Sequence, residues 1–185
     1  MLYIVAAALA LLLALSALSN LVRGAAKPVA APAPTLPTAS SAAAVDMRRT
    51  PGPLQWKPVI EQLDLRRGHM FTEPGNDDVL TVDAVSSPAF NTDDMLLKRL
   101  QRAHAHLRTY PMRVISVTEQ YSTVGDREPR ALVTVVDELG AYEVVDGRGR
   151  VLQTVAARGR ATWNVELRNT AWGWVYYSSI RATTK

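Results

Sequence analysis

The chain has 185 residues, no cysteine and a formal net charge of +4. The excess of basic residues lies in residues 1–55, which hold four basic residues against one acidic residue, so the remaining 130 residues carry a net charge of only +1. A nearly neutral domain is poorly suited to neutralising phosphates, which argues against nucleic-acid binding. The absence of cysteine excludes disulfides, thiolate zinc sites and iron–sulfur clusters.

An uncharged, mostly apolar run occupies residues 2–22. Its length matches the ~20 residues that a helix needs to span a bilayer. Small residues at 17–19 and 24–26 are compatible with signal-peptide cleavage. The run predicts that residues 1–22 are a transmembrane anchor or a signal segment. We expect an uncleaved anchor, because the run is longer than the usual signal h-region.

Residues 23–54 predict an extended linker, because Ala, Pro, Thr and Ser dominate them. Arg23 and Lys27 directly follow the apolar run, and the positive-inside rule alone would place the C-terminal part in the cytoplasm. A stalk is nevertheless typical of a domain held away from the outer face of a membrane. We therefore expect a single-pass protein of the cell membrane with an extracytoplasmic domain; a cytoplasmic domain and secretion after cleavage are the alternatives.

Helices are predicted in the first half of the folded region, which we expect at residues 55–185. Apolar residues at helical spacing predict a helix over residues 56–71. Residues 76–90 predict a short helix or turn that ends at Ser87-Pro88. Residues 91–94 read Asn-Thr-Asp-Asp, an N-terminal capping signal, and predict a helix whose apolar face runs to Leu107 and which Pro111 ends.

Strands are predicted in the second half, where the period of apolar residues changes to two. The alternation over residues 163–168 predicts one buried and one solvated face. Residues 146–149 read Asp-Gly-Arg-Gly and predict a hairpin turn with positive φ. Helices followed by antiparallel strands indicate an α+β domain. The predicted strands cover residues 114–121, 131–138, 142–145, 151–155, 162–168 and 174–180.

The order of several residue groups carries a resemblance to a known family. The groups include Trp56, residues 135–139 (Val-Val-Asp-Glu-Leu), the alternating run from Trp163 to Leu167, and residues 173–175 (Gly-Trp-Val). This order resembles actinobacterial membrane-anchored envelope proteins whose C-terminal domain belongs to the NTF2-like, cystatin-like superfamily. The resemblance covers about residues 56–181. The last two groups are the most specific, and they bear on fold more than on function.

The resemblance implies an NTF2-like cone, in which one long and two shorter helices pack on a strongly curved antiparallel sheet around a pocket. Proteins of this shape include isomerases, dehydratases and polyketide cyclases. They also include non-catalytic modules that dimerise through the sheet or assist envelope complexes. The resemblance therefore leaves enzymatic and non-catalytic functions open.

Asp137 is the main candidate for catalysis. It follows an apolar strand and shares the parity of Val133 and Val135, so it faces the pocket if they do. A carboxylate in an apolar pocket has a raised pKa and can remove a proton next to a carbonyl group. Tyr142 would then donate a hydrogen bond, with Trp163 and Val135 in the pocket wall. The structural alternative is that Asp137 marks the point where the strand leaves the core.

His104 is a second acid–base candidate, because it falls on the apolar face of the helix predicted to begin at residue 91. The alternative is a hydrogen-bonded histidine at the edge of the core. His106 lies two residues away and would point to the opposite side, so the two cannot hold a metal from one helix. We expect no metal site and no cofactor, since nucleotide, zinc-protease and hydrolase motifs are absent from the sequence.

Two further features suggest surfaces for contact. Arg148, Arg150, Arg158 and Arg160 alternate along the predicted strands and could line one face of the sheet, where they would meet anionic lipid or an acidic partner. The alternative is an ordinary solvated strand surface. Of the tryptophans at 172 and 174, we expect one in the core and the other exposed at an interface.

The sequence favours a non-catalytic, membrane-tethered accessory domain of the cell envelope that acts through contacts with an envelope protein or with a second copy of itself. The alternative is a small-molecule-binding or isomerase-like pocket with Asp137 as the base.

Overall fold

The structure, a computed structural model, describes residues 46–49, 52, 55–75, 79–123 and 127–182. These residues belong to one folded unit that begins at Val45. The predicted membrane segment at residues 1–22 and the linker up to residue 45 lie outside the described residues. Within the described residues, no helix has the length and apolar character needed to cross a membrane.

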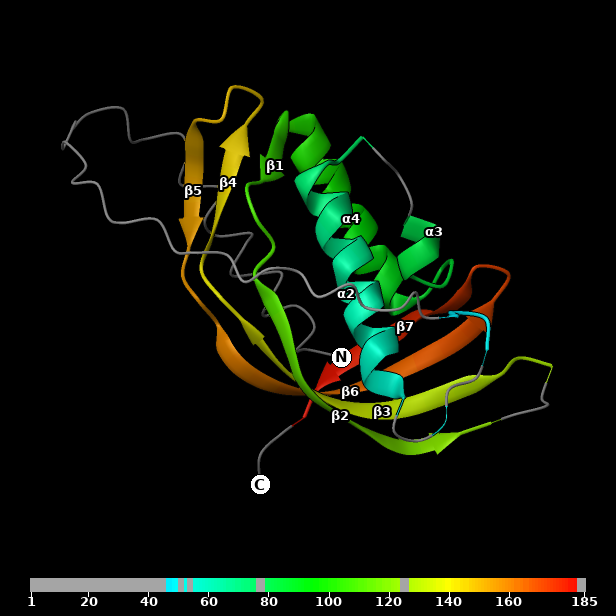
Figure 1. The fold of residues 1–185 in the computed structure, drawn as a ribbon. Coiled ribbons are helices and arrows are strands. Elements are labelled where there is room, and N and C mark those ends of the chain that lie inside the picture. Colours follow the sequence, from blue (N-terminus) through cyan, green and yellow to red (C-terminus); the bar gives the residue numbers. More distant parts are fainter. Residues whose placement is uncertain (1–45, 50–51, 53–54, 76–78, 124–126, 183–185) are drawn as a thin grey trace. The chain divides into compact units, whose positions relative to one another are not determined.

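The folded unit is an α+β domain in which helices come first and antiparallel strands follow (Figure 1). The change of period near residue 112 therefore predicts the fold class correctly. The helices are α2 (Trp56–Thr72), α3 (Val79–Val82) and α4 (Pro88–Arg102), and the strands are β1 (Ala105–Leu107), β2 (Met112–Ser122), β3 (Arg130–Leu139), β4 (Tyr142–Asp146), β5 (Val151–Val155), β6 (Gly159–Thr170) and β7 (Gly173–Arg181).

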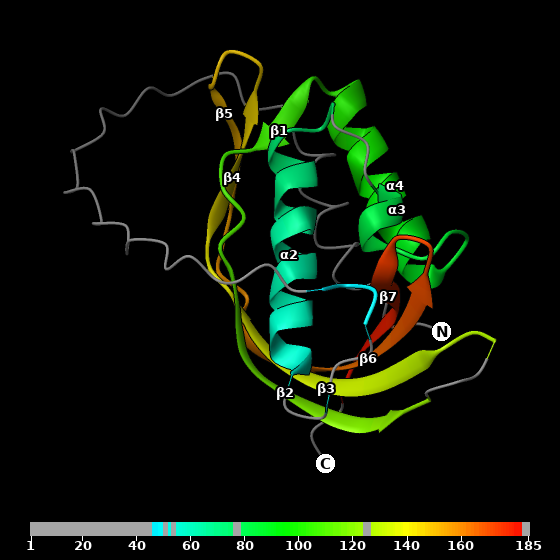
Figure 2. The ribbon, with the colours of Figure 1, turned by 45° about the vertical axis from the view of Figure 1, so that its right-hand side comes forward.

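The strands form two antiparallel sheets. The larger has the order β2-β3-β6-β7, and the smaller has the order β1-β4-β5. In β3, Ala131, Val133, Val135 and Asp137 are buried and alternate with more exposed residues, as the sequence predicts. Helices α2 and α4 cover the concave face of the strongly curved larger sheet (Figures 1 and 2). The helix-facing residues of β3 therefore line the interior of the domain.

The helix predicted to begin at residue 91 begins earlier and ends earlier. Ser87 is its N-cap: the Ser87 Oγ accepts a hydrogen bond of 3.0 Å from the Phe90 amide. Pro88 occupies the first helical position, where its missing N–H leaves no bond unmade. The helix ends at Arg102, and the left-handed His104 (φ 48°) turns the chain into β1. The prediction that the helix continues to Leu107 was wrong, because Leu107 is buried as a strand residue.

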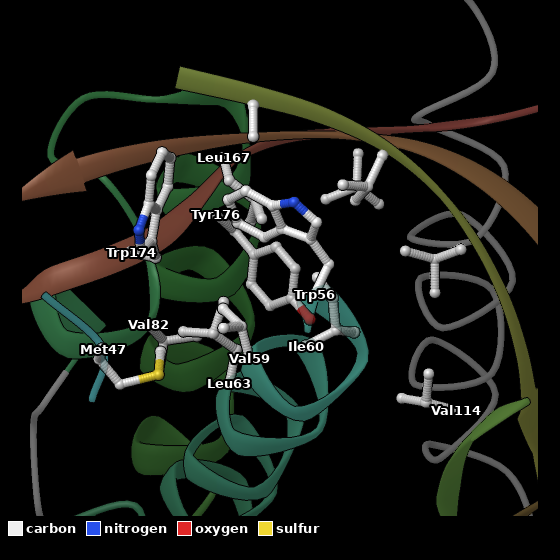
Figure 3. Close-up of a cluster of buried hydrophobic side chains, with 14 residues drawn as sticks. Met47, Trp56, Val59, Ile60, Leu63, Val82, Val114, Leu167, Trp174 and Tyr176 are labelled. Atoms are coloured by element: carbon white, nitrogen blue, oxygen red, sulfur yellow. The ribbon is translucent and has the colours of Figure 1, made fainter. Parts of the chain in front are cut away.

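The main hydrophobic core lies between α2 and the larger sheet (Figure 3). Trp56 and Trp174 pack edge to face with their ring centroids 4.9 Å apart. Trp174 is fully buried, whereas Trp172 is 57 % exposed, which confirms the predicted division between the two residues. A second cluster lies between α4, the C-terminal half of α2 and the smaller sheet.

Residues 46–49, which we call the strap, belong to the folded unit, although the composition assigns them to the linker. The Met47 side chain is buried in the main core (Figure 3), and the Met47 carbonyl accepts a hydrogen bond of 2.7 Å from the Trp174 amide. The Arg48 carbonyl accepts one from Asn169 at 3.0 Å, and the Arg49 carbonyl accepts one from the Trp174 indole at 3.2 Å. The strap therefore fixes the chain to the β6–β7 turn.

Gly173 makes this close approach of the strap sterically feasible. A Cβ atom at residue 173 would lie 2.5 Å from the Met47 carbonyl oxygen, which is a backbone atom with little room to move. The φ angle of Gly173 is +97°, in the region that favours glycine. Any larger residue there would displace the strap.

Candidate functional site

Asp137 faces the interior of the domain, as its parity predicts, but its carboxylate is already engaged. It is 7 % exposed and forms an ion pair with Arg158. The Trp163 indole N–H donates a hydrogen bond of 3.0 Å to the same carboxylate oxygen. The Arg158 guanidinium also lies over the Trp163 ring, 5.0 Å from its centroid. Burial raises the pKa of Asp137, whereas Arg158 and the indole N–H oppose that rise.

Val135 and Trp163 lie beside Asp137 because β3 and β6 pair in register there, with Val135 opposite Trp163. Tyr142 does not join them. The chain passes from β3 to β4 through Gly140, and β4 pairs with β1 and β5 in the other sheet. Tyr142 therefore packs against the second hydrophobic cluster, and burial raises the pKa of its hydroxyl.

His104 also lies apart from Asp137. It is exposed in the turn that follows α4, where the helix has already ended. The interpretation of His104 as a residue on an apolar helix face was wrong for that reason. The predicted set of Asp137, Tyr142 and His104 therefore does not converge, whereas Asp137, Trp163 and Val135 do.

The arginine series does not line one face of the sheet. Arg158 is partly buried against Asp137, whereas Arg160 lies beside Glu138 at 3.6 Å. Arg150 pairs with Asp146 in the β4–β5 turn, 2.7 Å away. The chain bends between β5 and β6, so residues that alternate in sequence belong to different surfaces.

A set of polar residues that the sequence patterns did not single out lies near Asp137. We call Asp64, Arg67, Tyr110, Asp137 and Tyr176 the inner polar cluster. The Tyr176 hydroxyl donates a hydrogen bond of 3.1 Å to Asp64. Burial raises the pKa of Asp64 to about 6, and the nearby Arg67 opposes that rise. The negative charge of Asp137 also raises the pKa of Asp64.

Tyr110 and Arg67 complete this cluster. Gly68 on α2 lets the Tyr110 ring pack on the helix, since a Cβ atom at residue 68 would lie 2.9 Å from the Tyr110 Cδ1. Burial raises the pKa of Tyr110, and the positive charge of Arg67 opposes that rise. The Arg67 side chain remains 28 % exposed and that of Arg158 24 %. The cations are thus inside the fold but still in contact with solvent.

Arg67 also lies close to two buried carboxyl groups, those of Asp83, directly after α3, and Asp93 on α4. Its guanidinium pairs with Asp93, and both Asp93 and Asp83 are only 1 % exposed. Among the described residues, neither oxygen of Asp83 has a hydrogen-bond donor. Burial and the charge of Asp93 raise the pKa of Asp83 to about 8. A protonated Asp83 can donate a hydrogen bond to Asp93. The two carboxyl groups then carry one negative charge, which Arg67 balances.

The sequence does contain a signal for these residues. Asp64 and Arg67 fall at the same helical spacing as the buried Ile60, Leu63 and Phe71 of α2. Asp93 likewise precedes Leu97 and Leu100 on the buried stripe of α4. A charged residue at the spacing of a buried apolar stripe is predicted to point into the interior of the domain. In contrast, no group of three or more His, Cys, Asp or Glu side chains in the described ranges is arranged to hold a metal ion.

Comparisons with known proteins give likeness of fold alone. No protein-family model matches the chain, and no curated protein sequence matches it. The intermembrane space region of the chloroplast protein ARC6 is similar in structure, with a TM-score of 0.50 and 8 % identity, over 74 % of this chain and 100 % of that one. Aln2 from a Streptomyces species has a TM-score of 0.40 and 12 % identity, over 72 % of this chain and 94 % of that one. The first likeness agrees with the α+β fold.

Proposed function

We propose that the protein is a membrane-tethered accessory domain of the cell envelope that acts through protein contacts, and that its α+β unit is an NTF2-like cone. The order of helices before strands and the curved sheet with helices on its concave face support that fold (Figures 1 and 2). The apolar run at residues 2–22 supports the tether, and the Ala- and Pro-rich residues 23–45 support a stalk. We place the domain outside the cytoplasm.

The observation that carries this proposal is the strap. Three backbone carbonyls of residues 47–49 accept hydrogen bonds from Asn169 at the end of β6 and Trp174 at the start of β7. The Met47 side chain is anchored in the main core. A chain that served only as a loose leader would need no such attachment. The strap gives the tether a fixed point of entry on the domain.

Asp137 supports the non-catalytic form of the proposal. An ion pair and hydrogen bonds to a carboxylate lower its basicity and fix its position. The Asp137 Oδ1 accepts hydrogen bonds from both Arg158 and Trp163. These contacts join β3, β6 and the segment before β6, which is a structural role.

Cross-linking in cells tests the proposal. A photo-reactive amino acid is placed at Ile180 on the outer face of the sheet or at Leu65 on α2, both of which are more than half exposed. We expect one of the two sites to give a discrete adduct with an envelope protein or with a second copy of the chain. A matched site at the buried Val133 should give none. Absence of an adduct at both exposed sites would contradict the proposal.

Protease treatment of intact cells tests the placement. A domain outside the cytoplasm should be degraded by added trypsin, while a cytoplasmic marker protein survives. A domain that is degraded only after lysis would overturn the extracytoplasmic assignment.

The inner polar cluster favours a second candidate function, the binding of a small polar molecule. A carboxyl with a pKa of about 6, a half-buried tyrosine and a partly exposed arginine together resemble the perturbed groups of binding and active sites. In this candidate Asp64 replaces Asp137 as the base, because Asp137 is paired with Arg158.

A fragment screen by thermal shift separates this candidate from the first. Fragments that enter the cluster should stabilise the solubilised full-length protein and lose their effect in Asp64→Asn. They should keep their effect in Asp94→Asn, which alters an exposed carboxylate on α4. Equal stabilisation of all three proteins, or no stabilising fragment, would contradict the candidate.

A further inference from the structure

We propose that the end of the domain that carries the strap rests on an anionic bilayer surface, with Trp172 at the level of the lipid headgroups. This inference rests on the proposed tether. The surface consists of the strap, the β6–β7 turn and the neighbouring end of the β2–β3 hairpin. These three parts lie at the same end of the larger sheet (Figures 1 and 2).

Hydrogen bonds and an ion pair hold the three parts together. The Asn169 side chain donates to the Arg48 carbonyl at 3.0 Å, which joins the β6–β7 turn to the strap. The Asn169 amide donates to the Pro129 carbonyl at 2.9 Å, which joins the turn to the β2–β3 hairpin. Arg168 pairs with Glu128 at 3.2 Å across the same junction. The surface is therefore a single ordered patch.

Trp172 gives this patch its apolar component. Its side chain is 57 % exposed at the tip of the β6–β7 turn, while the neighbouring Trp174 is fully buried. A large exposed indole is costly in water, but its amphipathic ring suits the boundary between headgroups and acyl chains. The turn places it in a position to enter a bilayer surface without unfolding any strand.

Four arginines and two exposed acidic residues, Asp46 and Glu128, lie in the strap and the hairpin. Arg48 and Arg49 on the strap and Arg127 and Arg130 on the hairpin are exposed. Their guanidinium groups form none of the ion pairs found among the described residues. Near the β4–β5 turn, Arg108 pairs with Glu143 and Arg150 pairs with Asp146, while Arg148 is exposed and forms none of the ion pairs found among the described residues. The four arginines of the strap and the hairpin outnumber Asp46 and Glu128, so this patch keeps positive charge for an external anion.

The origin of the tether selects a membrane as the occupant of this surface. The chain enters the domain through the strap, and only about 23 residues separate the strap from the end of the apolar run. The strap is therefore the point at which the folded unit is joined to the predicted membrane segment. Arginine beside an exposed tryptophan matches an anionic lipid surface in both charge and polarity.

Tryptophan quenching in lipid nanodiscs tests the inference. The full-length protein is reconstituted into nanodiscs of phosphatidylcholine alone or with phosphatidylglycerol, both containing brominated acyl chains. We expect quenching only with phosphatidylglycerol, and we expect Trp172→Phe to abolish it. The ratio of docked to undocked protein should fall about five-fold for each arginine neutralised in Arg48→Gln and Arg49→Gln. The attachment of the strap should survive these changes because it uses backbone carbonyls.

The matched control is Arg148→Gln with Arg150→Gln in the distant β4–β5 turn, which should leave the quenching unchanged. Three results would overturn the docking: quenching that persists in Trp172→Phe, no quenching with phosphatidylglycerol, or quenching that is unchanged in Arg48→Gln and Arg49→Gln. Trp172 that stays unquenched would instead point to a soluble acidic partner. A protein that fails to enter nanodiscs would contradict the tether itself, which separates failure of the proposed function from failure of the docking.

Discussion

Buried aspartates occur at two places in the interior, and the negative charge is compensated differently at each. In the sheet, Asp137 has its own cation, Arg158, and an indole N–H donor. Among the helices, Asp83 and Asp93 share the single cation Arg67, and neither oxygen of Asp83 has a donor among the described residues. Pairing with Arg158 therefore opposes protonation of Asp137, whereas burial and the charge of Asp93 raise the pKa of Asp83 to about 8.

The difference shows that burial alone does not decide the state of a carboxyl group. Both centres are desolvated, and desolvation is the largest cause of the raised pKa at each. The charge balance of the neighbours decides the outcome: Asp137 has Arg158 as its ion-pair partner, whereas Asp64, Asp83 and Asp93 share Arg67. The following four predictions test this contrast, in order of decreasing effect.

Replacing Arg67 should have the largest effect. Arg67→Met leaves Asp93 without its cation and Asp64 without its nearest positive charge. We expect the free energy of unfolding to fall by about 3–5 kcal/mol, as for a buried pair broken on one side. Urea denaturation of the full-length protein in detergent measures it. The control Lys98→Met removes an exposed helix pair and should cost about 0.5 kcal/mol or less. Equal losses would contradict a buried charge centre.

Replacing Arg158 should have a smaller effect, because its pair with Asp137 keeps some contact with solvent. We expect Arg158→Met to cost about 2 kcal/mol. The control Arg160→Met, two residues along the chain and 67 % exposed, should cost about 0.5 kcal/mol or less. Adding Asp137→Asn to Arg158→Met should restore part of the loss, since no charge is then left unpaired. A double variant less stable than Arg158→Met would count against the pair.

Removing the charge of Asp83 should increase stability at alkaline pH. Its folded pKa of about 8 lies above its ordinary value of 3.8, so the folded state holds the proton longer. Stability from this group is thus complete below about pH 4 and declines as the pH rises toward 8. Asp83→Asn mimics the protonated form and should be at least about 1 kcal/mol more stable than the wild type at pH 8.5.

Asp93→Asn provides the comparison, because it removes the partner of Arg67 and should destabilise the protein at every pH. Thermal unfolding between pH 4 and 9 follows both variants. A wild-type profile that stays flat between pH 5 and 8 would rule out a protonated Asp83.

Asp64 should give the smallest effect. Its pKa of about 6 lies above the ordinary 3.8, so stability should decline between about pH 4 and 6. Asp64→Asn should remove this decline, and at pH 4 the substitution itself should cost about 1 kcal/mol or less, because Tyr176 can still donate to the amide oxygen. Asp94→Asn, on an exposed residue, should leave the slope unchanged. An unchanged slope in Asp64→Asn would remove Asp64 from the cluster.

A separate prediction tests how tightly the strap is packed, by comparing two glycines with positive φ, one beside the strap and one in open space. Gly173→Ala should cost about 3 kcal/mol and expose the strap to trypsin, because the new Cβ atom meets the Met47 carbonyl. Gly149→Ala has a similar φ of +77° but open space around it, and should cost about 1 kcal/mol. Similar costs for the two changes would show that the strap is loosely held.

Local patterns predict the strands well but the site poorly. The parity of Val133, Val135 and Asp137 depends only on the two-residue period of a strand, and it places Asp137 inside. The partner of Asp137 is Arg158, 21 positions away, and the bend between β5 and β6 brings it inward. The periodicity of residues within a strand does not predict how the chain bends between strands. The sequence pattern therefore suggests a single face for the four arginines.

The helix that carries Asp93 shows the second limit. Residues 91–94 satisfy the composition of a capping sequence, but Ser87 caps the helix one turn earlier. Once the helix begins there, Asp93 lies on the buried stripe and meets Arg67 of α2. An aspartate can either cap a helix or lie in the interior as a charged group. Only the tertiary packing shows which of the two roles Asp93 has.

The most direct test of the contrast between the two centres is a pH titration of the aspartate carboxyl carbons by nuclear magnetic resonance. Asp83→Asn and Asp137→Asn assign the two signals in the full-length protein. We predict that the Asp83 carboxyl titrates near pH 8, while the Asp137 carboxyl, paired with Arg158, titrates at a lower pH than Asp83. An Asp83 signal already ionised at pH 6, or an Asp137 signal that titrates at the same pH as Asp83 or above it, would contradict the contrast.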